Sequence, residues 1–336
     1  MTIDKKKTNH HWRLPAEWEP QEGVQLTWPH ADTDWAPMLN DIIVVYQSMA
    51  REIALRERLI VVAPDNAAHG CLKIVCPTND TWARDHGFIS LVDDNGHRRL
   101  LDYRFNGWGE KFEAALDNAI NRRLYDLGEI GGEYSDCLDF VLEGGSIESD
   151  GQGTIFTTSQ CLLAPHRNQP MTKAEIEYRL KRDLGAERVM WIDYGNLIGD
   201  DTDGHIDTIV RVCPNDTLLY MGCDDPEDAQ YDDLKKMEAQ LRTFRTLNGQ
   251  PYHLKKLPMP RPVFDGDERL PATYANFLII NGAVLCPTYD QPDLDSEAMR
   301  IIGEAFPNRE IIGIDCCPVI RQHGSLHCCT MQFPRI

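Results

Sequence analysis

No stretch of this sequence approaches the roughly 18 to 20 consecutive apolar residues that a membrane-spanning helix needs. The start, MTIDKKKTNHHWRLPAEW, has a basic cluster with no apolar run behind it, which is not the pattern of a secretory signal. Basic residues are scarce, since 34 Lys and Arg face 53 Asp and Glu for a formal net charge of −19. This balance disfavours nucleic acid and anionic membrane surfaces as partners, and it weakly favours cationic small molecules.

A Cys-x-x-Cys pair is also missing, which excludes a zinc ribbon and a thioredoxin-like motif. The 11 cysteines are odd in number and irregularly spaced, and four residues separate Cys71 from Cys76. Without an export signal, this usage indicates reduced thiols. We therefore expect a cytoplasmic protein.

Linkers and low-complexity segments are absent too, so we expect a single domain over residues 1–336. Short apolar runs bounded by Gly, Pro, Asn or Asp predict strands, and amphipathic stretches between them predict helices. The cycle repeats at roughly a fifth of the chain, which indicates an α/β fold with internal pseudo-symmetry. The expected strands lie in 58–64, 86–93, 153–164, 188–193, 207–214, 217–223, 276–287 and 310–320, and the expected helices in 38–55, 108–127, 172–185, 226–247 and 296–306.

Polar residues gather where two of these strands begin or end, as catalytic groups on loops often do. In NDTWARDHGFISLV, Asp80, Arg84 and Asp85 crowd the entrance of an apolar strand beside Trp82. They form either a solvated turn or a place where Asp85 receives a cation. In FVLEGGSIESDG, Glu143 precedes two glycines, a pattern of either an ordinary hairpin or a close approach of the backbone to a ligand.

The stretch GDDTDGHIDTIVRV places His205 and Asp207 two residues apart on a strand-like run, where their side chains would share one face. Such a pair can be metal ligands, a base with its orienting group, or a buried hydrogen-bonded pair. Asp200, Asp201 and Asp203 add carboxylates whose repulsion calls for solvent, a metal or a cation to screen it.

Two cysteines, Cys328 and Cys329, stand together in HGSLHCCTMQFP, close to the end of the chain. A buried thiol is the commoner role for either one alone, and a reactive thiolate needs a lowered pKa or a proton acceptor. On a strand, His327 would point away from Cys328, so it is expected to add little. His205 is the best-placed partner.

Six segments in the same order carry a resemblance that covers nearly the whole chain. They are NDTWARDHGF, RFNGWGEKF, LEGGSIESDGQGTIFTTSQCLL, GDDTDGHIDT, ANFLIINGAVLCP and GSLHCCTMQ. Together they resemble the agmatine deiminase family and, more widely, the bacterial peptidyl-arginine-deiminase-type proteins. The resemblance implies the pentein α/β-propeller, in which five pseudo-symmetric ββαβ blades surround a central active site.

The resemblance also implies roles for individual residues. The family motif Gly-Gly-Gly-Asn-Ile-His-Cys aligns with QHGSLHC and makes Cys328 the nucleophile, with Cys329 as packing. Gln322, His323 and Ser325 depart from that motif beside the nucleophile, at positions that bear on substrate shape and on the mobility of the loop. The other implied roles are the acid/base at His205, guanidinium-holding carboxylates at Asp85 and Asp207, a contact from Glu143 to His205 or the substrate, and substrate contacts from Asp201, Trp82 and Trp108.

The implied reaction is hydrolysis of agmatine to N-carbamoylputrescine and ammonia, a step of putrescine biosynthesis, through a covalent cysteine intermediate. It uses neither metal nor cofactor, and the expected partner is a small guanidino compound. A homodimer is one candidate assembly.

Other readings of the same residues remain open. They are a peptidylarginine or free-arginine deiminase, a zinc protein that uses His205, Asp207, His327 and Cys328, and an inactive polyamine-binding relative.

Overall fold

The structure is a computed structural model that describes residues 11–65 and 74–336. Cys71 and the lysines at 5–7 lie outside these residues. Among the described residues, no helix combines the length and the apolar composition that crossing a membrane requires.

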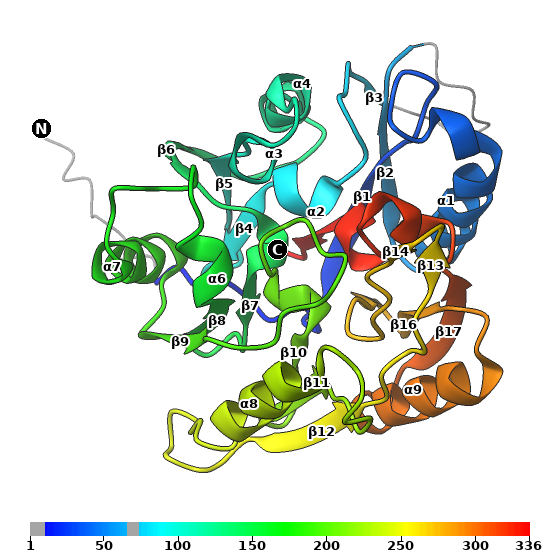
Figure 1. The fold of residues 1–336 in the computed structure, drawn as a ribbon. Coiled ribbons are helices and arrows are strands. Elements are labelled where there is room, and N and C mark those ends of the chain that lie inside the picture. The colour runs from blue at the N-terminus through cyan, green and yellow to red at the C-terminus, as the bar shows by residue number, and fades with distance from the viewer. Residues whose placement is uncertain (1–10, 66–73) are drawn as a thin grey trace, which may run out of the picture.

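Five sheets stand around a central axis in the described part of the chain, with the longer helices on the outside (Figure 1). Their strands are β18 (Thr330–Pro334), β1 (Gln21–Thr27), β2 (Arg58–Ala63) and β3 (Ile74–Val75); β4 (Ile89–Val92), β5 (Arg98–Arg104) and β6 (Glu133–Val141); β7 (Ile147–Ser149), β8 (Thr154–Thr158) and β9 (Arg188–Ile192); β10 (Val210–Cys213), β11 (Thr217–Met221) and β12 (His253–Leu257); and β15 (Leu278–Ile280), β16 (Ala283–Thr288) and β17 (Glu310–Asp315). A hairpin of β13 (Phe264–Asp265) and β14 (Glu268–Arg269) lies apart from them.

Every sheet has the same strand pattern. Its first strand pairs antiparallel with the second, and the second pairs parallel with the third. A parallel pair needs a crossover connection, and helices supply it here. These helices are α1 (Leu39–Ala54); α3 (Gly107–Glu110), α4 (Ala115–Asn118) and α5 (Ile120–Asp126); α6 (Ser159–Leu162) and α7 (Lys173–Leu184); α8 (Tyr231–Leu241); and α9 (Pro292–Ala305).

The repeating unit is therefore strand–strand–helix–strand, as the sequence analysis expects. The C-terminal strand β18 serves as the first strand of the sheet that contains β1, with Leu26 opposite Thr330. This pairing closes the ring and brings the end of the chain to the middle of the molecule (Figure 1).

Local sequence explains a typical crossover helix, α7. The hydroxyl of Thr172 accepts a hydrogen bond from the Glu175 backbone N–H, and the Glu175 side chain accepts one from the Thr172 N–H, which is a capping box. Ile176, Leu180 and Leu184 recur at helical spacing and are buried against the sheet side. Gly185 ends the helix at φ 65°, a conformation that glycine adopts without strain.

The strand expected over 153–164 ends at Thr158, where the helix α6 follows it. Two other expected elements are wrong in detail. The helix expected over 108–127 is broken into α3, α4 and α5, because Trp108 (φ 55°) and Gly109 (φ 84°) adopt left-handed backbone conformations. The strand expected over 207–214 begins only at Val210, since the residues before it form a 3-10 turn. Both departures lie beside the centre of the ring.

Candidate active site

At the centre, each of the five blades begins its first strand from a short turn that carries one or more polar side chains. Four of these turns are helical: α2 (Ala83–His86) before β4, η2 (Gly144–Ser146) before β7, η3 (Ile206–Thr208) before β10 and η5 (His327–Cys329) before β18. α2 packs against η2 and η5, and η2 packs against η3. The side chains that these turns and the fifth entrance, before β15, bring to the centre are Asp85, Glu143, His205, Asp207, Asn276 and Cys328.

Gly145 lies where three of these side chains converge. A Cβ atom placed on it would lie 2.6 Å from His205 Nδ1, 2.9 Å from Asp85 Oδ1 and 3.1 Å from Asp207 Oδ2. The Gly145 backbone N–H donates to Asp85 Oδ1 at 3.1 Å, so the main chain itself is part of this group. Only glycine fits there without displacing one of the three side chains.

The thiol of Cys328 is buried beside the same carboxylates. Its Sγ lies 3.4 Å from Asn276 Oδ1, and its backbone N–H donates to that oxygen at 3.3 Å. Burial raises the pKa of Cys328 well above its ordinary value, and the charges of Asp207 and Asp85 raise it further. The thiol therefore keeps its proton until a cation offsets these two charges.

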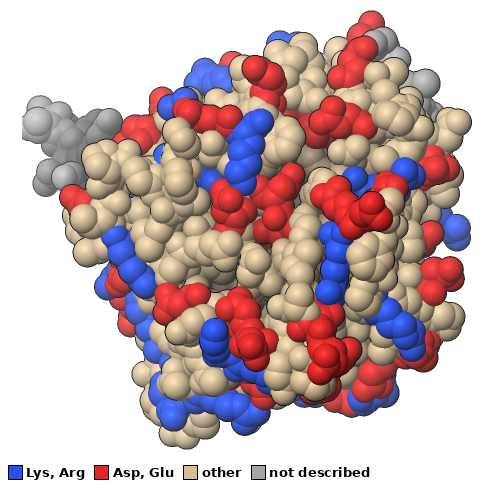
Figure 2. Space-filling model, in the orientation of Figure 1, with Lys and Arg blue, Asp and Glu red and all other residues tan. Residues whose placement is uncertain are grey.

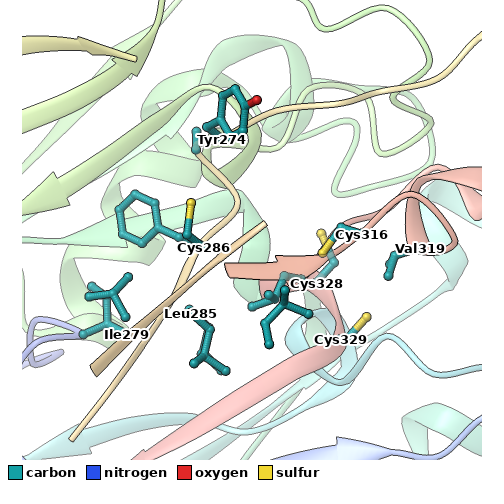
Figure 3. Close-up of a cluster of buried hydrophobic side chains, with 14 of the residues drawn as sticks. Tyr274, Ile279, Leu285, Cys286, Cys316, Val319, Cys328 and Cys329 are labelled. Atoms are coloured by element: carbon teal, nitrogen blue, oxygen red, sulfur yellow. The ribbon is translucent and has the colours of Figure 1, made fainter. Parts of the chain in front are cut away.

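The neighbouring thiol, Cys329, has different surroundings. Its Sγ donates to the Ser325 carbonyl at 3.4 Å, and burial raises its pKa to about 12. Figure 3 shows Cys329, like Cys328, within the apolar cluster that also contains Cys316 and Val319, so the two thiols differ in the oxygen that each one faces. These surroundings are those of a packing residue.

His205 is fully buried, and its Nδ1 lies 3.6 Å from Asp85 Oδ1. Neither of its ring nitrogens has a hydrogen-bond partner among the described residues. Burial opposes a charge on this ring, but the nearby Asp85, Cys161 and Glu143 together raise the pKa of His205 well above its ordinary value. The ring is thus held as a proton donor.

The two aspartates differ in their electrostatics. Burial raises the pKa of Asp85 to about 6, and Asp207 and Glu143 add to that effect. For Asp207, burial also acts to raise the pKa, but the hydrogen bond and charge of His327 lower it overall. Asp207 Oδ2 is 2.7 Å from His327 Nδ1, whereas its Oδ1 is buried and has no hydrogen-bond partner in the described part of the chain. Asp207 therefore has one oxygen free for a ligand.

Glu143 is anchored by a residue that the sequence analysis does not name. Arg167 Nε donates to Glu143 Oε1 at 2.8 Å, and the other nitrogens of Arg167 donate to Asp203 Oδ2 and the Thr202 carbonyl. Glu143 Oε2 is buried and has no hydrogen-bond partner among the described residues, and a ligand atom of Glu143 lies within 4.8 Å of one of His205.

A cavity of about 220 Å³ leads to this group of residues. Figure 2 shows acidic side chains near the middle of the face on which the blades converge in Figure 1. Trp108 does more than line the cavity, because its Nε1 donates to Asp85 Oδ2 at 2.9 Å. The lining includes the carboxylates Asp34, Asp80, Asp85 and Asp201, the aromatic rings of Trp82, Trp108 and Phe112, and Cys328.

Known proteins resemble this chain in sequence and in structure. The sequence profile described as Porphyromonas-type peptidyl-arginine deiminase matches residues 13–334. A Vibrio parahaemolyticus protein named "Putative agmatine deiminase" is 34% identical over 356 residues, covering 96% of both chains.

The chain belongs to the Porphyromonas-type peptidyl-arginine deiminase family.

Solved structures of similar proteins agree with this family membership. The structure named "Putative Arginine Deiminase from Porphyromonas gingivalis" is 50% identical with a TM-score of 0.90, covering 96% of this chain and 98% of that one. The C. jejuni agmatine deiminase with substrate bound is 36% identical with a TM-score of 0.89, covering 97% of each chain. A dimethylarginine dimethylaminohydrolase is only 11% identical at a TM-score of 0.53 and shares the fold alone. The expected pentein fold is confirmed.

The structure of this family member corrects one expectation about its nucleophile motif. His327 lies on a 3-10 turn, not on a strand, so its side chain is not directed away from the site. Its ring contacts Asp207 directly. Asn276, which bonds to Cys328, is a second residue that the sequence analysis missed; its place just before the strand in ANFLIING is the signal that could have found it.

The three residues that depart from the family motif each form a hydrogen bond with a nearby residue. His323 has φ 64°, a conformation that glycine adopts more easily, and its Nδ1 lies 2.9 Å from the Gly199 carbonyl. Gln322 Nε2 donates to the Asp34 carbonyl at 3.0 Å, and the Ser325 hydroxyl lies 2.9 Å from that of Tyr289.

The zinc site considered from the sequence is not formed in the described residues. Of its four ligands, only His205 belongs to a group with metal-binding spacing, in which ligand atoms of Glu143, Cys161 and His205 lie within 4.8 Å of one another. The guanidinium of Arg167 on Glu143 opposes a second cation at that place.

Proposed function

We propose that this protein hydrolyses agmatine to N-carbamoylputrescine and ammonia through a covalent intermediate on Cys328. The observation that carries the proposal is the group around Gly145, where His205 and Asp207 meet Asp85, which lines an acidic cavity together with Cys328. A planar cation held by carboxylates beneath a thiol is the arrangement that attack on a guanidinium carbon requires.

Binding of the guanidinium is the first step. Asp207 offers its free Oδ1, and both oxygens of Asp85 keep lone pairs beyond those used by Trp108 and Gly145. Charge-assisted hydrogen bonds from the guanidinium orient its central carbon toward Cys328. The same cation offsets the two carboxylate charges that raise the pKa of Cys328, so a thiolate forms only when substrate is present.

The reaction then proceeds in two steps, formation and hydrolysis of the covalent intermediate. The sulfur of Cys328 loses its proton and adds to the guanidinium carbon, His205 gives its proton to one nitrogen, and the C–N bond breaks. Ammonia leaves with the thiol proton as ammonium. Water then adds to the thiouronium carbon and gives a proton to His205, the C–S bond breaks, and the sulfur regains a proton from the former water.

The second positive charge of agmatine is complementary to the negatively charged mouth of the cavity. Asp34, Asp80 and Asp201 line it, and its described lining residues include no lysine or arginine side chain. An arginine substrate would place its α-carboxylate among these carboxylates, where the nearby Lys111 is already bonded to the Asp201 carbonyl and to Asp203. Free arginine is the second candidate, because the 50% identical P. gingivalis structure carries the name of an arginine deiminase.

An ammonia-release assay with agmatine, arginine and an arginine-containing peptide at equal concentration tests the proposal. Agmatine is expected to give a kcat/KM at least about 100-fold above free arginine, since an unpaired carboxylate buried among carboxylates costs on the order of a few kcal/mol. An arginine residue in a peptide has a neutral amide there and lacks the second positive charge of agmatine, so its kcat/KM should also be lower than that of agmatine. Comparable turnover of arginine, or citrulline formation in the peptide, would transfer the assignment to that substrate.

Activity is expected to fall in acid because of Asp85. Burial raises its pKa to about 6, so the carboxylate that binds the cation is ionised only above that pH. As pH drops through 6, kcat/KM should decline by about tenfold per pH unit. Initial rates at low agmatine concentration from pH 4.5 to 8 measure this, and a profile that stays flat down to pH 4.5 would contradict the role given to Asp85.

Three further expectations accompany the proposal. They are a single domain over residues 1–336, a cytoplasmic location and a homodimer. Limited proteolysis, fractionation of cells, and light scattering on the purified protein test them in turn.

A further inference from the structure

Next to the group around Gly145 lies a second cluster of charged side chains that the proposed chemistry does not use. Arg211 is fully buried at its centre, and His327 is 1% exposed. The cluster draws on strands and turns from several blades. Its members are Glu17, Arg84, Glu148, Arg211 and His327.

His327 lies between two carboxylates. Its Nδ1 is 2.7 Å from Asp207 Oδ2, and its Nε2 is 2.8 Å from Glu17 Oε1. Ionised carboxylates only accept hydrogen bonds, so Nδ1 donates to Asp207 Oδ2. Nε2 faces two groups, the Glu17 carboxylate at 2.8 Å and, at the longer distance of 3.2 Å, Arg211 Nη2, which also donates to Glu17 Oε2 at 2.6 Å. The shorter contact favours a proton on Nε2 that is donated to Glu17.

Glu17 is held firmly in turn. Arg84 Nη1 donates to its Oε1 at 3.0 Å, and Arg211 Nη2 donates to its Oε2. Arg211 is itself fixed by Glu148 and by the carbonyls of Ala275 and Phe277, on either side of Asn276. Burial acts to raise the pKa of Glu17, but His327, Arg84 and Arg211 lower it well below its ordinary value. Glu17 is therefore a fixed negative charge behind His327.

We propose that Glu17 and His327 are positioning residues, which hold Asp207 through a Glu17–His327–Asp207 chain so that Oδ1 of Asp207 faces the guanidinium. The chain binds Oδ2 and leaves Oδ1 as the free oxygen. A segment near the N-terminus, before the first blade, thereby sets the geometry of a site formed mostly by later blades. This inference rests on the proposed function, because it assigns Asp207 to the substrate.

Two amide substitutions at position 327 separate the two hydrogen bonds. His327→Asn places an amide nitrogen near the position of Nδ1, where it can donate to Asp207 but cannot reach Glu17. His327→Gln places its amide near the position of Nε2, where it can reach Glu17 but not Asp207. We expect His327→Asn to keep agmatine kcat/KM within about 10-fold of the wild type and His327→Gln to lose about 100-fold, as misplaced groups do.

Glu17→Gln and Glu19→Gln form a matched pair for the other end of the chain. Glu19 lies on the same segment but bonds to Arg13 and not to His327. Glu17→Gln should lower kcat/KM by about 10-fold, whereas Glu19→Gln should leave it unchanged. Melting temperatures of all four variants show whether a loss of activity reflects unfolding.

Equal losses in His327→Asn and His327→Gln with intact melting temperatures, or wild-type activity in both, would overturn the inference. ¹⁵N-histidine NMR of the ligand-free wild-type protein provides a readout without substrate. Two protonated nitrogens on His327 support the chain, and one unprotonated nitrogen contradicts it. If wild-type protein releases no ammonia from any guanidino compound while the NMR result holds, the proposed function fails and the chain stands.

Discussion

Replacing Cys328 by serine is expected to abolish ammonia release from agmatine, with a loss of at least about 10³-fold in kcat, as removal of a catalytic nucleophile does. The hydroxyl of serine is a much weaker nucleophile and would need a base to ionise it. The nearest charges, Asp207 and Asp85, disfavour an anion at this position until the substrate binds. Steady-state ammonia release measures the loss.

Binding should survive in the same variant. The carboxylates and the cavity are unchanged, so calorimetry should show agmatine bound with near wild-type affinity. Cys329→Ser is the matched control, because Cys329 Sγ faces the Ser325 carbonyl in the apolar cluster. It should cost some stability and leave kcat unchanged. Wild-type turnover by Cys328→Ser would rule out a covalent mechanism at this residue.

The sequence pattern predicts the blades well where helices bury one face on a sheet. α1, α7 and α8 fall within the expected helical ranges, and α9 begins at Pro292, four residues before its expected start, because their apolar residues recur at helical spacing. It fails at 108–127, where periodicity continues across Trp108 and Gly109 although both adopt left-handed backbone conformations. Trp108 donates to Asp85, so the break in the helix positions a side chain of the site. Hydrophobic periodicity carries no information about such a contact.

The fold also brings the candidate residues together, but the sequence pattern did not predict which of them contact one another. Asp85, His205 and Asp207 are each recognisable beside a strand, and they meet around Gly145. Arg167 and Glu17 lie far from them along the sequence, in segments without a distinctive motif. Their contacts depend on closure of the ring, which local spacing does not report.

The strongest test of the arrangement itself is Gly145→Ala, which adds one methyl group and removes no catalytic atom. The new Cβ would lie 2.6 Å from His205 Nδ1 and 2.9 Å from Asp85 Oδ1, closer than atoms in contact can approach. One of these groups must move, and a displacement of about 1 Å near reacting atoms can cost about 100-fold. We therefore expect kcat/KM for agmatine to fall by at least about 100-fold.

Gly303→Ala is the control for the Gly145→Ala result. Gly303 lies in α9, and a Cβ on it would meet Ile311 Cγ1 at 3.4 Å, an ordinary contact. Alanine is favoured over glycine in helices by about 1 kcal/mol, so this variant should be slightly more stable and fully active. If Gly145→Ala is folded and as active as Gly303→Ala, His205, Asp85 and Asp207 do not converge at Gly145 in the working protein. The cation would then have to be held elsewhere in the cavity, and the proposed attack by Cys328 would lose its geometric basis.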